Sequence, residues 1–462
     1  MNSKIIEDIL EISLKRGGDF AEIYFEETKS IYFRIEDKKI EEITFGEDYG
    51  VGIRVIKEDK TFYGYTQDVS FNGLEKLSRN ISEIIYEERP EKIISLEEKD
   101  FKTKVRIIKD LKDIEIKEGV DFLKFMDEKA RSYDQRIVQF TGIIRSVDQN
   151  VIIANSEGEF KEDKRLRTAI YALSVGSKNG LIQTGIDAYG VFSGWNIITI
   201  DLIEKISLDS SRRAILMLEA VDAPAGVMPV VISSKAGGVI IHEAVGHGLE
   251  GDLVNKNASV YAGKIGQKVA SEAISLVDAG TLDGNYGSFA FDDEGIPSQY
   301  NILIEKGILK GYMHSRITAK KMGVKPTGNG RRQNYRFPPI PRMTNTFLLP
   351  GKISPNEIIN SVDRGIYVVK MGGGQVDTIS GDFVFAVEEG YLIEKGKIIK
   401  PIRGATLIGN GPKILESIEM VGNDLSFTHG TCGKDMQGVP VSDGMPTILI
   451  PQITIGGTKK ED

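Results

Sequence analysis

Cysteine is nearly absent from this 462-residue chain, which contains only Cys432. A single thiol excludes an intrachain disulfide, and because disulfides accumulate in oxidising compartments this favours the cytoplasm. The first residues, MNSKIIEDILEISLKR, mix charges at helical spacing and lack the apolar core of a signal peptide. No apolar run approaches the ~18 residues of a membrane span. We therefore expect a soluble, cytoplasmic protein with no membrane partner.

A surplus of basic residues is also missing. The chain has 59 Lys and Arg against 67 Asp and Glu, which gives a net charge of −8. Proteins that bind nucleic acids usually carry a basic surplus, so the composition argues against a nucleic-acid partner. With 40% hydrophobic and 27% charged residues the composition is that of a globular protein. The length allows about two to four domains.

Proline and histidine are scarce in the first half of the chain. Pro90 is the only proline before Pro224, and all four histidines and Cys432 also lie beyond that point. The second half is rich in Gly and Pro, which mark loops and tight turns. This shift predicts three domains. They are an N-terminal α/β unit over 1–90, a middle α/β unit over 112–222 and a C-terminal domain over 224–462.

The first two units follow the same plan of helix, strands and helix. Helices are predicted at 3–16, 70–87, 115–133 and 200–221 from apolar positions at helical spacing. Strands are predicted at 19–27, 29–36, 40–46, 51–57 and 61–67 in the first unit, and at 136–148, 151–156, 159–176 and 180–190 in the second. A charged linker, 88–112, separates the units. The repeated order predicts an α+β fold whose N-terminal part is a duplicated β-meander/helix unit.

The C-terminal domain begins with the apolar run Val227–Ile232, a predicted buried strand. Ser233 or Ser234 then caps a predicted helix. The rest is expected to be mostly β, with short strands and long loops. Further helices are predicted only near 313–322, 354–361 and 411–419.

The most informative segment is HEAVGHGLEGD, residues 242–252. Histidines at i and i+4 on a helix can bind one metal ion. His242 and His247 are five apart, which leaves their rings roughly 140° apart on an ideal helix at ~100° per residue. A π-bulge would bring them together by widening one turn. Alternatively, the helix ends near Gly246 and His247 turns back.

A catalytic zinc site needs a third protein ligand. The candidates are Cys432, His314, His429, Glu250 and Asp252. Among them a thiolate is the donor that most favours zinc. A lone cysteine is, however, commonly a small buried hydrophobe. The spacing alone therefore leaves metal binding and simple packing both open.

Three weaker motifs follow. Asp292–Gly295 is an acidic turn, which we expect to be solvated. The Gly-rich basic loop 327–332 either binds a phosphate or a peptide carboxylate or is purely structural, so Arg331 and Arg332 are candidate substrate-binding residues. Residues 371–374, MGGG, lack the strand-then-helix context of a nucleotide loop.

Several blocks of the chain resemble the TldD/PmbA family of metallopeptidases. They are 242–252, 292–323, 326–335, 341–351, 380–398, 403–412 and 432–450, with looser matches at 18–27 and 49–56. The resemblance implies zinc (Zn2+) held by His242, His247 and Cys432, with Glu243 as general base, in a metallopeptidase domain over 224–462. Because the chain keeps all four residues, it resembles the active TldD-like member. Met436 and the pair Ser442-Asp443 depart from the family pattern, where smaller residues are expected.

The resemblance also implies a function and partners. Family members act on unfolded peptides and form dimers with an enclosed cleft. We therefore expect a zinc-dependent peptidase that acts on unfolded or extended peptides, as a homodimer or a heterodimer with a PmbA/TldE-like subunit. An extended peptide would add a strand to a free sheet edge, and an arginine of 331–336 would stabilise the oxyanion. The alternatives are a non-catalytic peptide-binding or regulatory protein and a zinc hydrolase of non-peptide amides.

Overall fold

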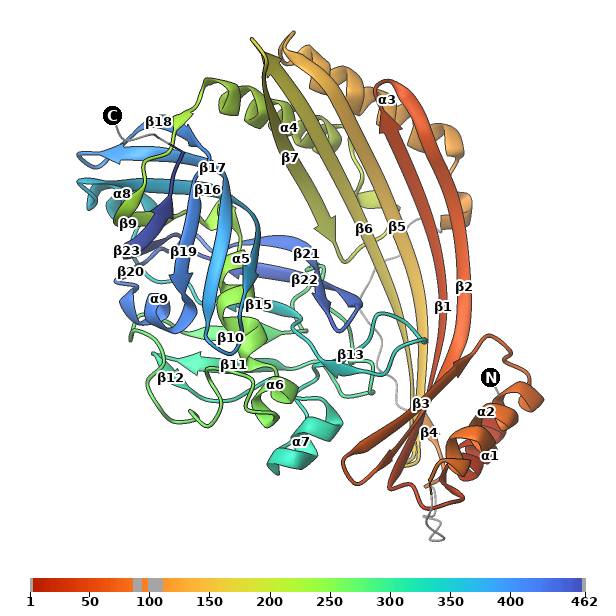
Figure 1. The fold of residues 1–462 in the computed structure, drawn as a ribbon. Coiled ribbons are helices and arrows are strands. Elements are labelled where there is room, and N and C mark those ends of the chain that lie inside the picture. Colours follow the sequence, from red (N-terminus) through yellow and green to blue (C-terminus); the bar gives the residue numbers. More distant parts are fainter. Residues whose placement is uncertain (1–2, 86–93, 99–110, 459–462) are drawn as a thin grey trace.

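The computed structural model describes residues 3–85, 94–98 and 111–458 of the chain. The predicted linker, 88–112, and the predicted end of the helix at 70–87 lie largely outside these ranges. The fold is α+β, as the sequence predicts. A long curved sheet, built by both N-terminal units, stands on one side of the molecule, and the C-terminal region packs against it (Figure 1). None of the helices in the described ranges is long and apolar enough to cross a membrane.

The duplicated plan is present in the structure, and both copies contribute to one sheet. The first copy consists of α1 (Ser3–Leu14), β1 (Phe20–Glu36), β2 (Lys39–Lys57), β3 (Lys60–Thr66) and α2 (Phe71–Glu83). The second consists of α3 (Ile116–Ser132), β5 (Ile137–Asn155), β6 (Glu159–Lys178), β7 (Leu181–Val191) and α4 (Ile200–Glu219). The strand order is β3-β2-β1-β5-β6, with β7 and the short β4 (Glu97–Glu98) both paired to β6. The antiparallel pair of β1 and β5 joins the two copies.

Several strands are longer than predicted. The separate strands expected at 19–27 and 29–36, at 40–46 and 51–57, and at 136–148 and 151–156 are wrong, because each pair is one continuous strand. Polar residues in or beside the predicted breaks instead contact the C-terminal region. For example, Glu26 accepts a hydrogen bond from the backbone N–H of Tyr335, and Asp48 pairs with Arg336. The tertiary contact, not a turn, explains the break in the apolar pattern.

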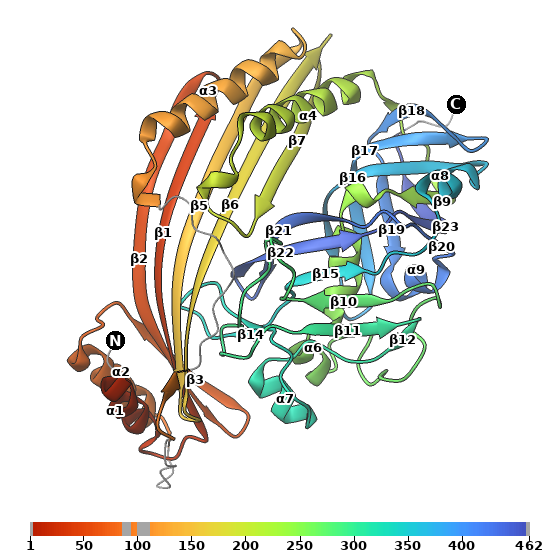
Figure 2. The ribbon, with the colours of Figure 1, turned by 180° about the vertical axis from the view of Figure 1, so that it is seen from behind.

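The two faces of the long sheet have different partners. One face is apolar: Ile31, Phe33 and Ile144 pack beneath α3 and α4 at one end, and other side chains of β1 and β2 pack against α1 and α2 at the other. Figure 2 shows α1 and α2 on the side of the sheet away from the C-terminal region, and α3 and α4 lying across the other end of the sheet. Because side chains alternate along a strand, the intervening residues face the C-terminal region, and many of them are charged.

A buried ionic cluster joins this polar face to the C-terminal region. Arg54 pairs with Glu22 at 2.6 Å and with Glu294 at 2.7 Å. Arg165 pairs with Asp293 at 2.6 Å. The expectation that the acidic turn Asp292–Gly295 is solvated is therefore wrong: Asp292, Asp293 and Glu294 are all buried. Arginines of the distant N-terminal sheet neutralise this turn, and sequence spacing alone does not reveal them.

A second set of ion pairs attaches α4 to the C-terminal region. Glu389 accepts hydrogen bonds from Arg212 at 3.0 Å and from Arg213 at 2.8 Å. The two attachments lie at separate places along the long sheet, which holds the C-terminal region in one orientation.

The C-terminal region contains two main sheets. In the first, β9 (Gly226–Ile232), β23 (Ile448–Gly456), β19 (Thr406–Asn410), β17 (Asp382–Glu394) and β16 (Arg364–Val376) pair in a closed ring, with β18 (Lys397–Arg403), β8 (Val221–Asp222) and β20 (Met420–Val421) attached. The second has the order β12-β11-β10-β15-β22-β21, namely Ile308–Leu309, Tyr300–Glu305, Leu276–Ala279, Asn345–Leu348, Gln437–Met445 and Ser426–Lys434. The short strands β13 (Gly330–Arg331) and β14 (Ile340–Pro341) pair with each other.

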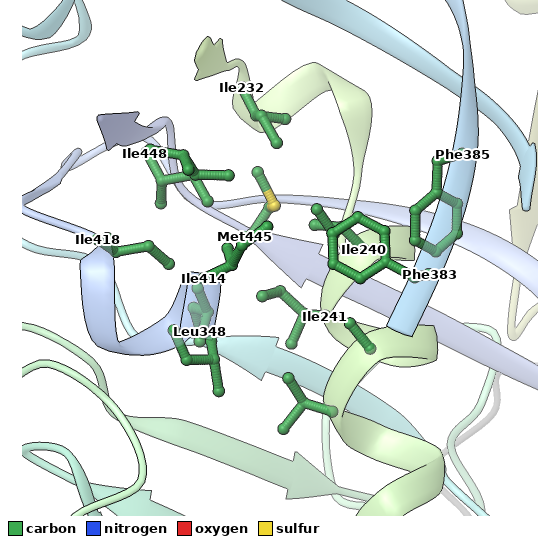
Figure 3. Packing of buried hydrophobic residues seen from close by; sticks show 14 of the residues in the cluster. Ile232, Ile240, Ile241, Leu348, Phe383, Phe385, Ile414, Ile418, Met445 and Ile448 are labelled. Atoms are coloured by element: carbon green, nitrogen blue, oxygen red, sulfur yellow. The ribbon is translucent and has the colours of Figure 1, made fainter. Parts of the chain in front are cut away.

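Helices of this region lie close to their predicted positions. They are α7 (Arg316–Met322), α8 (Pro355–Asn360) and α9 (Gly411–Ser417), together with α5 (Val239–Ile241) and α6 (Gly251–Asn255), which flank the two-histidine motif. Ile240 and Ile241 of the motif segment pack among Phe383, Phe385 and Ile414 in the largest hydrophobic core (Figure 3). The motif is therefore anchored by apolar side chains on the side away from its histidines.

The buried ionic cluster generates a stability prediction. Arg54→Met leaves Glu22 and Glu294 buried without this cation, and we expect the free energy of unfolding to fall by about 3–5 kcal/mol. Urea denaturation monitored by circular dichroism measures the change. The matched control is Arg79→Met, which removes an exposed pair with Glu75 and should change stability by at most ~0.5 kcal/mol. Equal losses in the two variants would contradict a special role for the buried cluster.

Candidate metal centre

The motif segment begins with two separate turns. Ser233 accepts a hydrogen bond from the N–H of Lys235 and caps only a 3₁₀ turn, Ser234–Ala236. Gly237, at φ 70°, ends that turn, and α5 starts after Gly238. The prediction that Ser233 or Ser234 caps the motif helix is thus wrong, because the left-handed glycine separates them from it.

A π-helical turn, His242–Gly246, accounts for the five-residue spacing of the histidines. The N–H of His247 donates to the carbonyl of His242, which is the i to i+5 hydrogen bond of a π turn. Gly246 and His247 keep right-handed helical dihedral angles. The π-bulge prediction is therefore confirmed, and the alternative of a helix that ends at Gly246 is wrong. A 3₁₀ turn, His247–Leu249, continues the segment.

The structure brings His242, His247 and Cys432 together. One ligand atom from each lies within 4.8 Å of the others. The Nε2 atoms of His242 and His247 lie 3.1 Å and 3.6 Å from Cys432 Sγ, and the two rings are perpendicular. All three side chains are buried. Both imidazoles therefore direct the same nitrogen towards the same sulfur, which is the arrangement that a shared ion requires.

The other nitrogen of each imidazole is held by a carboxylate. His242 Nδ1 lies 2.7 Å from Asp443 Oδ1, and His247 Nδ1 lies 2.9 Å from Glu250 Oε2. An Nδ1–H that donates to a carboxylate leaves the Nε2 lone pair free for a metal and fixes the ring orientation. This double pairing is typical of histidines that bind metals.

Lys434 ties the strand of Cys432 to the motif segment. Its Nζ donates to Glu250 Oε2 at 3.0 Å, to Asp252 Oδ1 at 2.7 Å and to the Pro341 carbonyl at 3.2 Å. Arg342, fully buried, donates to the backbone carbonyl of Cys432. The hairpin of β21 and β22 is thus cross-linked to the histidine-bearing segment by several charge-assisted hydrogen bonds.

The metal-free cluster is strongly charged. Burial opposes ionisation of the Cys432 thiol, but the neighbouring imidazoles outweigh it and lower the thiol pKa to about 5. Burial likewise opposes the charged form of His247, but Glu250 and Cys432 raise its pKa to about 9. For Glu250, His247 and Lys434 outweigh burial and lower the pKa to about 2. A thiolate is the form of cysteine that binds metals.

Glu243 is the partly exposed acid of the centre. Its side chain is 30% exposed, and its Oε2 lies 3.8 Å from His247 Nε2. Burial raises the pKa of its carboxyl above the ordinary value. Glu243 therefore lies beside the three-residue group, on the side that reaches solvent.

The other candidate ligands lie elsewhere. His314 Nδ1 lies 3.2 Å from the hydroxyl of Thr318, and burial lowers its pKa to about 4. His429 stacks edge-on against Tyr286. Glu250 and Asp252 are bound by Lys434, as described above. Over the described part of the chain, none of these four joins the group of His242, His247 and Cys432.

Arg331 and Arg332, the candidate substrate-binding residues, are both buried. Arg331 donates to the Met343 carbonyl at 2.6 Å. Arg332 donates to Glu22 and to the Asp293 carbonyl, and so belongs to the ionic cluster. Because both guanidinium groups bind inside the protein, the structure does not support direct contact with a substrate, and the purely structural interpretation of loop 327–332 is the better one.

Sequence reasoning missed Lys434, Arg342 and Asp443 as parts of the centre. Lys434 and Arg342 carry no local signal, because each acts on a residue about 90 or more positions away in the chain. Only Asp443 stood out in the sequence, because the resemblance implies a smaller residue at its position.

One edge of the second C-terminal sheet lies open beside the centre. β21, which carries Cys432, is the last strand of that sheet. Residues along it alternate between facing β22 and facing outwards. Within the described residues, the outward backbone groups of Thr431 and Gly433 have no hydrogen-bond partner. A free strand edge therefore runs directly beside the sulfur of Cys432.

Comparisons with known proteins identify a family whose models match most of the chain. The chain matches the PmbA/TldD family models, described as PmbA/TldA metallopeptidase domain 1 over residues 21–85, the central domain over 109–218 and the C-terminal domain over 225–457. It is 38% identical to a metalloprotease TldD homolog of Haemophilus influenzae, over 99% of this chain and 97% of that protein. It is 36% identical to a metalloprotease of Methanocaldococcus jannaschii, over 96% and 97% of the two chains.

Solved structures share the fold. TldE from Thermococcus kodakarensis superposes with a TM-score of 0.75 at 21% identity, covering 98% of this chain and all of that one. A Thermotoga maritima protein described as a candidate modulator of a DNA gyrase superposes with a TM-score of 0.79 at 24% identity, covering 98% and 99%. At these identities the likeness supports the arrangement of elements.

Proposed function

This chain belongs to the PmbA/TldD family of metallopeptidases, and we propose from that membership and its buried His-His-Cys group that it is a zinc-dependent peptidase. The observation that carries the proposal is the convergence of His242 Nε2, His247 Nε2 and Cys432 Sγ within 4.8 Å. The relatives from Haemophilus influenzae and Methanocaldococcus jannaschii are both named metalloproteases.

The donor set fits zinc. Two imidazoles and a thiolate match the preference of zinc for nitrogen and sulfur, and three protein ligands correspond to a catalytic rather than a structural site. The carboxylates on both Nδ1 atoms hold the rings in the form that binds a metal. When bound at such a site, zinc acts as a Lewis acid and makes water a nucleophile near neutral pH.

Glu243 is the proposed general base. Adjacent residues on a helix point about 100° apart. His242 therefore points into the ligand cluster, and Glu243 lies at the side of the cluster. Its carboxylate accepts the proton of the attacking water and returns it to the leaving amine of the cleaved peptide. Partial exposure of Glu243 leaves it accessible to water and substrate from the open side.

Unfolded or extended peptides are the proposed substrates. The free edge of β21 offers unpaired backbone groups at Thr431 and Gly433. An extended peptide that adds a strand there would pass beside Cys432 and bind mainly through its main chain. A folded protein already pairs its own strands, so it would be a poor substrate.

The first prediction concerns the metal. We expect about one zinc ion per chain in the purified protein, measured by mass spectrometry of the metal content, and a large loss of zinc in Cys432→Ser because a hydroxyl is a poor substitute for a thiolate. Thr431→Ser, a change at an exposed neighbouring residue, is the control and should keep its zinc. Full zinc in Cys432→Ser would refute Cys432 as the third ligand.

The second prediction concerns Glu243. Glu243→Gln keeps the shape and removes the basicity, so hydrolysis of an unfolded polypeptide should fall by about 10²–10⁴-fold while zinc content stays normal. His242→Ala should lose zinc and activity together. Glu305→Gln, at an exposed residue paired with Lys310, serves as the control. Normal hydrolysis by a folded, zinc-loaded Glu243→Gln protein would refute the role of Glu243 as base.

The third prediction concerns assembly. We propose a dimer, either of two copies or with a PmbA/TldE-like subunit, supported by the family resemblance and by the shared fold with a solved TldE. Light scattering of the purified chain, alone and mixed with such a subunit, should detect a species of twice the mass of the single chain. A monomer with full peptidase activity would contradict this proposal.

A further inference from the structure

The structure places Asp443 of β22 against a proposed metal ligand. Its Oδ1 lies 2.7 Å from His242 Nδ1, and its side chain is only 9% exposed. The resemblance leads to the expectation of a smaller residue at this position, so the family pattern does not account for this carboxylate.

The backbone around Asp443 is held on three sides. Asp443 is paired with Thr346 on β15 and with Thr428 on β21. At the start of the motif segment, Gly238 packs against the next residue, Gly444: an added Cβ at Gly238 would lie 2.5 Å from its nitrogen. The close approach that this glycine permits brings β22 against the motif segment and so sets Asp443 beside His242.

Within the described residues, His242 is the only side chain that the Asp443 carboxylate binds. The Thr428 hydroxyl donates a hydrogen bond to the Asp443 backbone carbonyl, and no Lys or Arg of the described ranges forms an ion pair with Asp443. Glu250, the equivalent partner of His247, in contrast has Lys434 at 3.0 Å. A buried carboxylate is costly unless it is paired, and the imidazole of His242 is the partner of Asp443, which indicates that Asp443 acts through that ring.

We propose that Asp443 is a positioning residue for the metal: it accepts the Nδ1–H of His242 and so directs the Nε2 lone pair towards the ion. This inference rests on the proposed function, because it presumes that His242 binds a metal. Asp443 and Glu250 then form a matched pair of supports, one for each imidazole. The two carboxylates come from different elements, since Asp443 lies on the β21–β22 hairpin and Glu250 on the motif segment itself.

The consequence is a specific dependence of metal affinity on Asp443. Loss of a carboxylate that supports a metal-binding histidine typically weakens metal binding by about 10–100-fold. Asp443→Leu and Asp443→Ala remove the acceptor, and we expect this loss in both. Asp443→Asn keeps an acceptor oxygen and removes the charge, so its affinity should lie between those of the wild type and of Asp443→Ala.

The experiment measures zinc affinity by competition with a chromogenic chelator and records the absorption spectrum of the cobalt(II)-substituted protein. The spectrum reports ligand geometry and does not depend on peptidase activity. Asp424→Asn is the matched control, because Asp424 also accepts hydrogen bonds, from the backbone N–H and the hydroxyl of Thr447 between β22 and β23, at 2.9 Å and 2.7 Å. We expect weaker zinc binding and an altered cobalt spectrum in the Asp443 variants and neither in the control.

The outcomes separate this inference from the proposed function. Asp443→Ala that is folded, binds zinc as tightly as the wild type and shows the same cobalt spectrum would overturn the inference alone, provided that the wild type binds zinc and cleaves peptides. A lower melting temperature with unchanged affinity would give Asp443 a purely structural role and also overturn it. Wild-type protein that binds no zinc would overturn both. If Asp443→Leu does not fold, Asp443→Ala decides.

Discussion

The hydrogen bond from the His247 N–H to the His242 carbonyl widens one turn of the motif segment, and the geometry of the centre depends on it. A regular α-helix would point the two imidazoles roughly 140° apart at ~100° per residue. The π turn instead directs both Nε2 atoms towards Cys432 Sγ. Apolar packing of Ile240 and Ile241 holds the same segment from the other side, so the irregular turn is kept in a rigid setting.

The β21–β22 hairpin supplies the other residues of the proposed metal site. It supplies the proposed third ligand, Cys432, together with Lys434 and Asp443, which bind Glu250 and His242 respectively. Lys434 and Asp443 bind the motif segment through hydrogen bonds between charged groups inside the protein, the kind that contributes more to stability than a neutral one. Side chains that are already ordered in this way lose less conformational entropy when a metal ion binds than the side chains of a flexible site.

The long N-terminal sheet holds the C-terminal region in place through buried ion pairs. Its apolar face binds its own helices, and its polar face binds the C-terminal region through the cluster of Glu22, Arg54 and Glu294. Such a cluster costs desolvation energy and adds directionality, because its charges are satisfied in only one relative placement of the two parts. The loop of Arg331 and Arg332 is part of this junction, and both guanidinium groups bind inside the protein.

Local pattern determined a good part of this protein. The α+β class, the repeated order of helices and strands and the helices near 316–322, 355–360 and 411–417 follow from periodicity, which acts over a few positions. The residue types of the proposed site, His242, Glu243, His247 and Cys432, were also visible in the sequence, through the motif and the family resemblance. The spacing of the histidines left two backbone solutions, because periodicity does not distinguish a π turn from a helix end.

Only the tertiary structure decided the remainder. The break predicted at Thr28 is absent, because neighbouring Glu26 is bound by Tyr335 of the C-terminal region, 309 positions away in the chain. The acidic turn at 292–295 was expected to be solvated because the arginines that pair with it, Arg54 and Arg165, lie far away in the chain. Asp443 and His242 are 201 positions apart, and their contact exists only because β22 docks against Gly238. Hydrogen bonds and ion pairs between distant segments depend on how whole elements pack, and no local pattern of residues records that.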